Sequence, residues 1–248
     1  MRQSRMVRGL LHRAGFDIGR WPRRPDDWVM DWALATVLRT HQVNCVLDVG
    51  GNLGHFGQLI RALGYTGRIV SYEPSPTALP TLRKAAAHDP SWLIRPVGLS
   101  AEPGTAELHL HVGSEFDSLH SVLPGAATQI QRLAEVDTAT ITLSTVALEF
   151  AEAVANLPRP QVLLKSDTQG HDLEVIAGAD GMPAAVVAVL VELSAQPLYQ
   201  DQPRMTRIID ALQDEGFAPV AFQPISREEA DDLRMIELDG LFMRPVRA

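Results

Sequence analysis

An aspartate followed by closely spaced glycines is the first group of residues with types and spacing suited to chemistry. Asp48 lies in a short apolar run that ends at Val49, and Gly50, Gly51 and Gly54 follow, with Asn52 among them. Glycine lets the backbone approach a ligand closely and adopt a positive φ angle at little cost. If a helix follows, its free N–H groups point at the same place. The stretch therefore predicts a nucleotide-binding turn between a strand and a helix.

The flanking residues predict the elements that hold this turn. Residues 45–49 form an apolar run too short for a helix, which indicates a strand buried on both faces. From Phe56 onward, apolar residues recur at the i, i+3, i+4, i+7 spacing of an amphipathic helix. A second apolar run, residues 68–72, ends in Glu73. A carboxylate at this strand end can accept hydrogen bonds from the ribose hydroxyls of a nucleoside, although a solvated acid at a strand end is the simpler alternative.

The spacing of the glycines separates this turn from a dinucleotide-binding fingerprint. They cannot be placed on the pattern G-x-G-x-x-G. The order acid-x-Gly-x-Asn-x-Gly instead resembles the acid-x-Gly-x-Gly-x-Gly loop of S-adenosylmethionine-dependent methyltransferases, with Asn52 in place of the middle glycine. A tight turn in another α/β protein stays open as the alternative.

A second stretch places charged side chains at the end of another buried strand. The run that begins at residue 162 leads into Lys165 and Asp167, and the chain then turns at a glycine and enters a helix. Asp167 is therefore expected at the carboxyl end of a central strand, where open α/β sheets bind their ligands. The next apolar run brings Glu192 to the same edge of the sheet.

Asp167 and His171 are the predicted catalytic residues, because they flank one turn at this edge. A hydroxyl is a weak nucleophile and needs a base or a cation beside it. His171 has a suitable pKa for a base near neutrality, with a surface histidine at a helix start as the alternative. Asp167 and Glu192 could instead bind Mg²⁺ through oxygen ligands, or orient a substrate hydroxyl directly.

Residues 113–137 predict a long polar connection of the kind that often forms a binding loop. Within it Asp117, Ser118 and His120 are expected to contact the substrate, together with Glu192, while an exposed irregular loop is an equal alternative. The preceding strand, residues 105–112, alternates apolar residues with polar ones that include two histidines. Those histidines could bind a metal, but alternation alone explains them.

Composition limits the classes of function. Residues 1–24 hold seven arginines and one acid, so the remaining residues hold 15 basic and 29 acidic side chains, a net charge of −14. Such an acidic body is a poor platform for nucleic acid. The single cysteine argues against a disulfide framework, and no apolar run suits a membrane span or a signal peptide. We expect a cytoplasmic protein with an N-terminal helical appendage over residues 1–39 and one domain over residues 40–248, and a homodimer stays open.

With these stretches together, the sequence resembles the FkbM family of S-adenosylmethionine-dependent methyltransferases over roughly residues 40–245. The resemblance implies an α/β fold with a Rossmann-like sheet in the order 3-2-1-4-5-7-6, strand 7 antiparallel and helices on both faces. It also implies transfer of a methyl group from S-adenosylmethionine to a hydroxyl of a sugar, a glycan or a related natural product. The matching stretches are VLDVGGNLGHFG, SYEP, KSDTQGHDLEVIAGA, VELS and GF…DGLFMR. The expected cofactor-binding residues are Asp48, Gly50, Gly51, Asn52, Gly54, Phe56 and Glu73.

The chain departs from the family pattern at several positions. Where the family usually has Thr-Leu-Asp, this chain has Thr145-Val146-Ala147, so the aspartate is absent. His171 and Ser166 replace residues that are usually apolar or aromatic. Ala147 and Asn52 are the hints for the alternative function, a nucleotide-binding scaffold that has lost catalysis.

Overall fold

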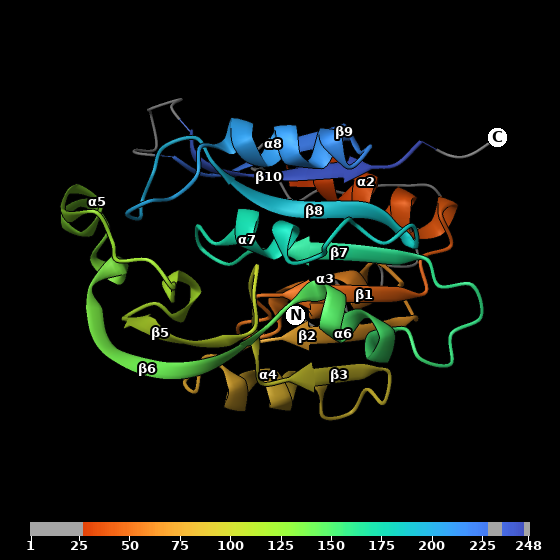
Figure 1. Ribbon diagram of the computed structural model, residues 1–248, viewed down its shortest axis with the longest axis horizontal. Coiled ribbons are helices and arrows are strands. Elements are labelled where there is room, and N and C mark those ends of the chain that lie inside the picture. The colour runs from red at the N-terminus through yellow and green to blue at the C-terminus, as the bar shows by residue number, and fades with distance from the viewer. Residues whose placement is uncertain (1–26, 228–234, 246–248) are drawn as a thin grey trace.

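A seven-stranded sheet forms the centre of the computed structural model, which describes residues 27–227 and 235–245 (Figure 1). The strand order is β3-β2-β1-β7-β8-β10-β9. Neighbouring strands from β3 to β8 pair in parallel, whereas β10 is antiparallel to both β8 and β9. This confirms the predicted Rossmann-like order with its one reversed strand. The strands are β1 Cys45–Val49, β2 Arg68–Tyr72, β3 Trp92–Arg95, β7 Val162–Ser166, β8 Val186–Ser194, β9 Ala218–Arg227 and β10 Met235–Met243.

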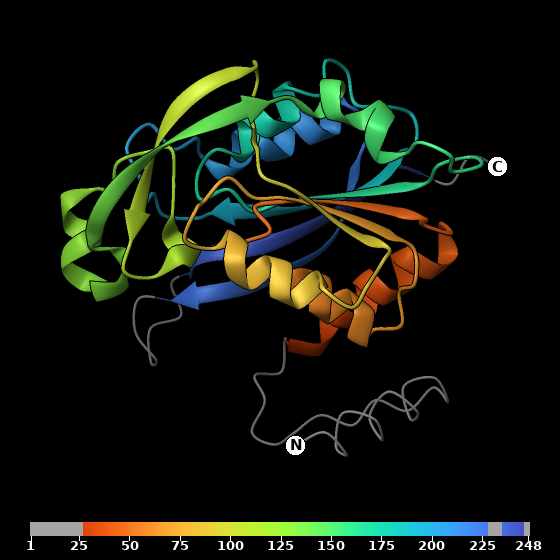
Figure 2. The ribbon, with the colours of Figure 1, turned by 90° about the horizontal axis from the view of Figure 1, so that it is seen from below.

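Helices cover both faces of this sheet, which explains why its central strands are apolar throughout (Figure 2). All residues of β1 are buried, and they alternate between the two faces. Val46 packs in the cluster on one face, while Leu47 and Val49 pack in the cluster on the other. One face carries α2 Asp27–Thr40, α3 His55–Ala62 and α4 Leu79–Ala86; the other carries α6 Val146–Ala153, α7 Asp172–Ala177 and α8 Met205–Asp214.

Helix α2 packs on the sheet through apolar residues at helical spacing. Met30, Leu34 and Val37 are buried in the core on its side of the sheet. The boundary predicted between the N-terminal appendage and the domain falls at the end of this helix. The arginine-rich part of the predicted appendage, residues 1–26, lies outside the described residues.

A second, three-stranded sheet extends from the crossover between β3 and β7 (Figure 1). Its strand order is β4-β6-β5, and we call residues 98–144 the insertion. The prediction of a polar loop over residues 113–137 was wrong at its end, because β6 begins at Glu135. The later part of β6 alternates apolar residues with threonines, but its first four residues, 135–138, are all exposed, so the pattern does not mark where the strand begins. The elements are β4 Gly98–Leu99, β5 Gly104–His111, η1 Ser114–Phe116, α5 Pro124–Gln129, η2 Gln131–Leu133 and β6 Glu135–Ser144.

None of the helices in the described part of the chain is long and apolar enough to cross a membrane.

Candidate functional site

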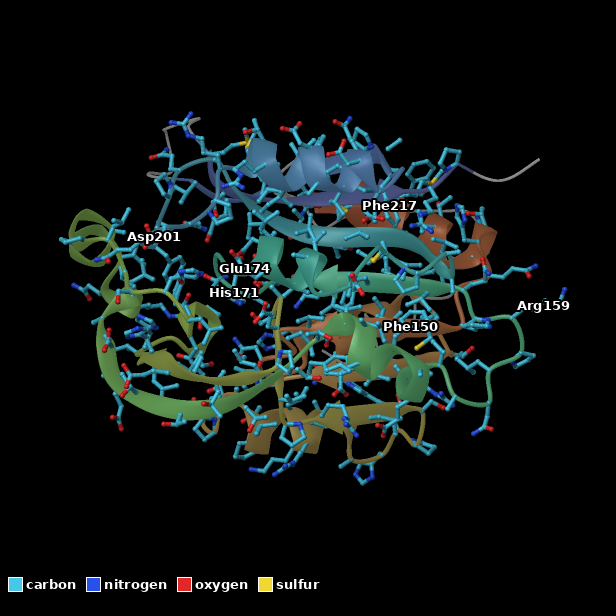
Figure 3. The ribbon with its side chains drawn as sticks, viewed as in Figure 1. Phe150, Arg159, His171, Glu174, Asp201 and Phe217 are labelled. Carbon is cyan, nitrogen blue, oxygen red and sulfur yellow. The ribbon has the colours of Figure 1, made fainter. Side chains whose placement is uncertain are left out.

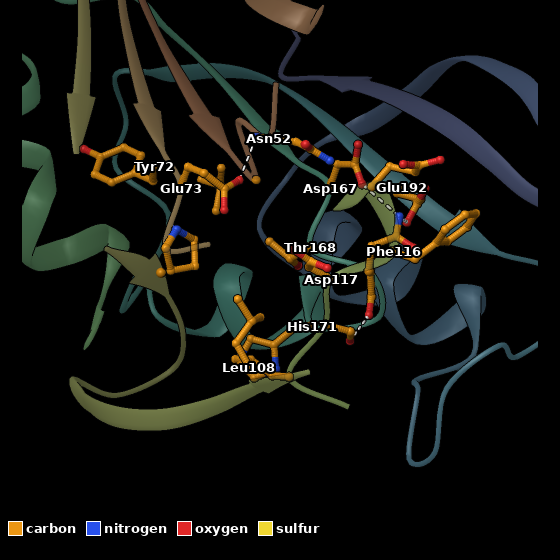
Figure 4. Close-up of a pocket in the computed structure, with 18 of the residues that line it drawn as sticks. Asn52, Tyr72, Glu73, Leu108, Phe116, Asp117, Asp167, Thr168, His171 and Glu192 are labelled. Atoms are coloured by element: carbon orange, nitrogen blue, oxygen red, sulfur yellow. Dashed lines mark hydrogen bonds between the residues drawn. The ribbon is translucent and has the colours of Figure 1, made fainter. Parts of the chain in front are cut away.

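A cavity of about 400 Å³ lies at the carboxyl ends of the parallel strands, between the main sheet and the insertion (Figure 4). Its volume falls in the range of roughly 300–1,000 Å³ that is typical of small-molecule sites. One part of the wall is apolar and comes largely from the insertion. This part includes Leu99, Leu108, Phe116, Ile141 and Leu143.

Gly50 is the loop residue for which only glycine fits. Its φ angle is +74°, and a Cβ atom built on it would lie 1.9 Å from the carbonyl oxygen of Asp167. The backbone N–H groups of Gly50 and Gly51 both donate to the carbonyl oxygen of Tyr72, at 3.0 and 3.1 Å. The loop therefore passes directly against the end of β7 while it is tied to the end of β2. This places the loop backbone at the cavity wall, as predicted.

Three other predicted cofactor contacts support the loop from behind and do not line the cavity. A Cβ atom on Gly51 would lie 2.9 Å from that of Ser71, and one on Gly54 would lie 3.0 Å from that of Ala85. These glycines thus let the loop pack closely on β2 and α4. The Lys165 ammonium lies over the ring of Phe56, 5.7 Å from the centroid of the ring.

Glu73 reaches the cavity wall from the end of β2, where the sequence places it. Its carboxylate oxygens accept hydrogen bonds from the backbone N–H groups of Asn52, at 2.6 Å, and Ser75, at 2.7 Å. Only 5% of the residue is exposed, and this burial raises the pKa of the carboxyl to about 7. Glu73 is therefore a fixed acceptor that titrates near neutrality.

Asp48 lies under the loop and is not part of the cavity wall. It is fully buried, accepts a hydrogen bond from the Ser71 hydroxyl at 2.6 Å, and lies 3.3 Å from the Lys165 ammonium. The structure therefore places Asp48 in a buried ion pair. The predicted direct role in cofactor binding stays a prediction.

Lys165 is a residue that sequence analysis did not assign to the site. Its ammonium donates to the carbonyl oxygens of Val49, at 3.1 Å, and Gly50, at 2.7 Å, and lies 3.6 Å from the Asp167 carboxylate. Burial lowers the pKa of Lys165, but the Asp167 and Asp48 carboxylates outweigh this effect and hold the pKa above its usual value. The charged lysine joins the ends of β1 and β7. The sequence does contain a signal for this role, because a lysine that follows three apolar residues in a buried strand needs charged or polar partners.

Four carboxylates line the side of the cavity opposite Glu73, and we call them the acidic wall. In Figure 4 Asp167 and Glu192 lie on this side, while Glu73 and Tyr72 lie on the other. Glu192 faces Asp239 across the antiparallel β8–β10 pair. Burial, and then the neighbouring negative charges, raises the pKa of Asp239 to about 7 and that of Glu192 well above its ordinary value. The acidic wall consists of Asp167, Glu192, Glu237 and Asp239.

Gln169 connects two residues of the acidic wall that were predicted to hold Mg²⁺. Its amide nitrogen donates to Asp167 Oδ1 at 3.2 Å and to Glu192 Oε2 at 2.8 Å. The Tyr199 hydroxyl donates to the amide oxygen of Gln169 at 2.8 Å and so fixes its orientation. An amide donor therefore lies between the carboxylates, and a cation could bridge them only if Gln169 moved.

His171 lies in the cavity wall, but both of its ring nitrogens face polar partners. Nε2 lies 2.9 Å from the Ser100 hydroxyl, and Nδ1 lies 3.2 Å from Nε2 of His120. Burial lowers the pKa of His171 to about 4, so the imidazole is neutral near pH 7. His120 is in contact with His171 and does not line the cavity. The predicted roles of His171 as a base and of His120 as a substrate contact stay predictions.

Asp117 and Ser118 lie in the cavity wall and also attach the insertion to the main sheet, while their predicted contact with the substrate stays a prediction. Asp117 accepts a hydrogen bond from the Ser75 hydroxyl at 2.8 Å, and the Ser118 hydroxyl donates to the carbonyl oxygen of Gln169 at 2.7 Å. His111 was expected on the exposed face of β5, but it is buried. A register shift between Leu110 and His111 turns the side chain inward, so the predicted alternation fails there.

Comparisons with known proteins place this geometry in context. A family model described as "Methyltransferase FkbM domain" matches residues 48–219. No curated protein matches the chain significantly in sequence. The solved structure of precorrin-6y C5,15-methyltransferase from Geobacter metallireducens is 14% identical, with a TM-score of 0.45 over 92% of this chain and 93% of that one. An rRNA methylase from Streptococcus thermophilus is 10% identical, with a TM-score of 0.48 over 91% of this chain and 99% of that one.

Proposed function

Because the chain belongs to the FkbM methyltransferase family, we propose that it methylates a hydroxyl of a sugar, a glycan or a related natural product with S-adenosylmethionine. The observation that carries the proposal is the division of one cavity into two sides. One side has a glycine turn and a fixed carboxylate suited to a nucleoside. The other side has the acidic wall, which suits a polyhydroxylated acceptor.

The first side fits the adenosyl group of the cofactor. The missing Cβ atom of Gly50 lets the loop backbone reach the cavity, and Glu73 is held there by two backbone N–H groups. A carboxylate has about four acceptor positions, so Glu73 can still accept hydrogen bonds from ribose hydroxyls. The apolar wall from the insertion, which includes Leu108 and Ile141, supplies surface for a flat base.

The second side fits an acceptor rich in hydroxyls. Carboxylates accept hydrogen bonds from hydroxyl groups, and the acidic wall presents several of them around one space. The Asp167 side chain is 42% exposed, whereas Glu192 and Glu237 of the same wall are buried. We assign Asp167 the role of orienting the acceptor hydroxyl and accepting its proton.

The reaction gains mostly from alignment and from exclusion of water. Bound S-adenosylmethionine supplies a methyl group on a positively charged sulfur, and the charge is neutralised on transfer. Holding two reactants in line can contribute on the order of 7–11 kcal/mol in favourable cases. The insertion covers part of the cavity opposite the main sheet and is attached there through Ser118, so it reduces the access of water to this space.

Other parts of the prediction are kept as proposals. An acidic body disfavours nucleic acid as the acceptor, and a cytoplasmic location agrees with the single buried cysteine, Cys45. A Mg²⁺ ion at Asp167 and Glu192 requires a displaced Gln169. Activity that is unchanged by EDTA would remove the need for such an ion.

Calorimetry followed by product analysis tests the proposal. We expect S-adenosylmethionine and S-adenosylhomocysteine to bind and NAD not to bind, and we expect Glu73→Ala to weaken binding. A panel of hydroxylated glycans and metabolites, incubated with isotope-labelled cofactor and analysed by mass spectrometry, should show label on an acceptor oxygen. Cofactor binding without transfer by the wild type to any acceptor in the panel would favour the inactive scaffold, and binding of NAD instead would reject both functions.

A further inference from the structure

Three metal-ligating side chains meet beside the cavity, and we call His120, His171 and Glu174 the histidine cluster. His120 comes from the insertion. His171 and Glu174 come from the start of α7, where Figure 3 labels both. One ligand atom of each side chain lies within 4.8 Å of the others. Among the described residues, three or more histidine, cysteine, aspartate or glutamate ligand atoms come within this distance of one another in this group alone.

The distances suit a small tetrahedral metal centre. His120 Nε2 lies 3.2 Å from His171 Nδ1, which lies 3.8 Å from Glu174 Oε2. Bonds of about 2.0–2.1 Å at the tetrahedral angle place zinc ligands about 3.3–3.4 Å apart. The two measured distances lie on either side of this value, so small side-chain movements would complete the geometry.

The cluster contains a buried oxygen that needs a partner. Glu174 Oε2 is inaccessible to solvent and has no hydrogen-bond partner within the described part of the chain. A buried polar atom without a partner costs free energy, and a bound cation would remove that cost.

The surroundings orient His171 toward the cluster. The Ser100 hydroxyl contacts its Nε2 at 2.9 Å, which leaves Nδ1 directed at His120 and Glu174. Metal-binding histidines usually have such a partner on the second ring nitrogen. The carbonyl oxygen of Ser100 packs directly against Gly178, just after α7. A Cβ atom on Gly178 would lie only 2.0 Å from this oxygen, so the backbone of Ser100 is close to the end of the helix.

We propose that the histidine cluster binds one divalent transition-metal ion of the zinc type, which fastens the insertion to α7. Two imidazoles and one carboxylate favour Zn²⁺ or Co²⁺ over Mg²⁺, which prefers oxygen ligands. Three protein ligands leave one position for water. A metal bound through Nδ1 of His171 prevents that nitrogen from acting as a base, so the ion and the predicted catalytic role of this atom exclude each other.

Metal titration of the full-length protein tests the inference without any assay of methyl transfer. After treatment with EDTA and dialysis, calorimetry should show one Zn²⁺ ion per chain, and Co²⁺ should develop the visible absorption of a tetrahedral site. Zn²⁺ should raise the unfolding temperature, because it binds the folded state, whereas Mg²⁺ should not. Glu174→Gln and His120→Asn should each weaken Zn²⁺ binding by at least tenfold.

A histidine in strand β5 of the insertion provides a matched control. His109 pairs with Glu135 at 3.0 Å outside the cluster, so His109→Asn removes an imidazole and should leave Zn²⁺ affinity unchanged. Circular dichroism in EDTA checks that each variant is folded. Glu174→Gln, which keeps the shape of the side chain, decides the result if His120→Asn does not fold. Zn²⁺ affinity in Glu174→Gln equal to that of the wild type would overturn the proposal, as would equal stabilisation by Mg²⁺.

Discussion

Gly50→Ala should destabilise the protein by about 3 kcal/mol or more, because the new methyl group has no space and the backbone is left-handed. A Cβ atom at this position would lie 1.9 Å from the carbonyl oxygen of Asp167, whereas real Cβ contacts are not shorter than 3.0 Å. The Asp167 peptide would have to move by the difference of 1.1 Å. That movement strains the hydrogen bond from the Thr168 N–H of the same peptide group to the Asp172 carboxylate, now 3.2 Å long. The left-handed backbone of Gly50 adds roughly 1–2 kcal/mol for any residue with a Cβ atom.

Gly64→Ala is the matched control. Gly64 also has a positive φ angle, +95°, but a Cβ atom there would meet nothing within 4 Å. This variant should therefore lose only the backbone contribution, roughly 1 kcal/mol. At about 2–4 °C per kcal/mol for a chain of this size, the two variants should differ in unfolding temperature by about 4–8 °C.

Urea and thermal denaturation measure both variants, and calorimetry with S-adenosylhomocysteine measures the site. We expect Gly50→Ala to lose at least tenfold in affinity, because the displaced peptide forms part of the cavity wall, and Gly64→Ala to bind normally. Equal unfolding free energies for the two variants would refute the reasoning, since the clash with β7 would then contribute nothing.

Three further predictions concern buried charges. Lys165→Met should lower the free energy of unfolding, measured by urea titration, by about 3–5 kcal/mol, because it leaves Asp48 buried without its partner. Adding Asp48→Asn should restore part of this stability. A single variant as stable as the wild type would contradict the ion pair. Burial raises the pKa of Glu73 to about 7, so the carboxylate gains a proton as pH falls below 7 and loses acceptor capacity. Calorimetry should show cofactor affinity falling up to about tenfold per pH unit below 7. A similar slope in Glu73→Gln would exclude this carboxyl as the cause. Burial also raises the pKa of Asp239 from 3.8 to about 7, so between these pH values the folded state holds a proton that the unfolded state releases. The free energy of unfolding should therefore fall as pH rises from about 4 to about 7. Asp239→Asn should flatten this pH profile in urea titrations, and an unchanged slope would contradict the assignment to Asp239.

The cofactor side of the site was predictable because its signals are local. The apolar run before Asp48, the glycine spacing and the acid at position 73 lie within short stretches whose elements follow from periodicity alone. The reversed strand β10 was expected from the family resemblance and is confirmed by its pairing with β8 and β9. Strand β6 has an apolar alternation only in its later part, and its exposed first three residues were predicted as loop.

The acceptor side depends on residues that are far apart in the chain. Asp239 faces Glu192 only because β10 pairs with β8, so its membership of the acidic wall follows from strand register. Lys165 has a structural role because the ends of β1 and β7 meet around its ammonium, and no short stretch of sequence shows that they meet.

By itself, the amino-acid sequence determined the family, the strands and helices of the main sheet, and the strand ends at which a ligand would bind. The family follows from the resemblance of its motifs, whereas the elements and the strand ends follow from patterns of period 2 and 3.6 and from glycines, which act over a few residues. The tertiary structure alone decided which polar groups are buried and what they contact, including the amide of Gln169 between two acids and the meeting of His120 with His171. The physical reason is that burial and close approach are set by packing between elements distant in sequence, to which neighbouring residues in the chain contribute little information.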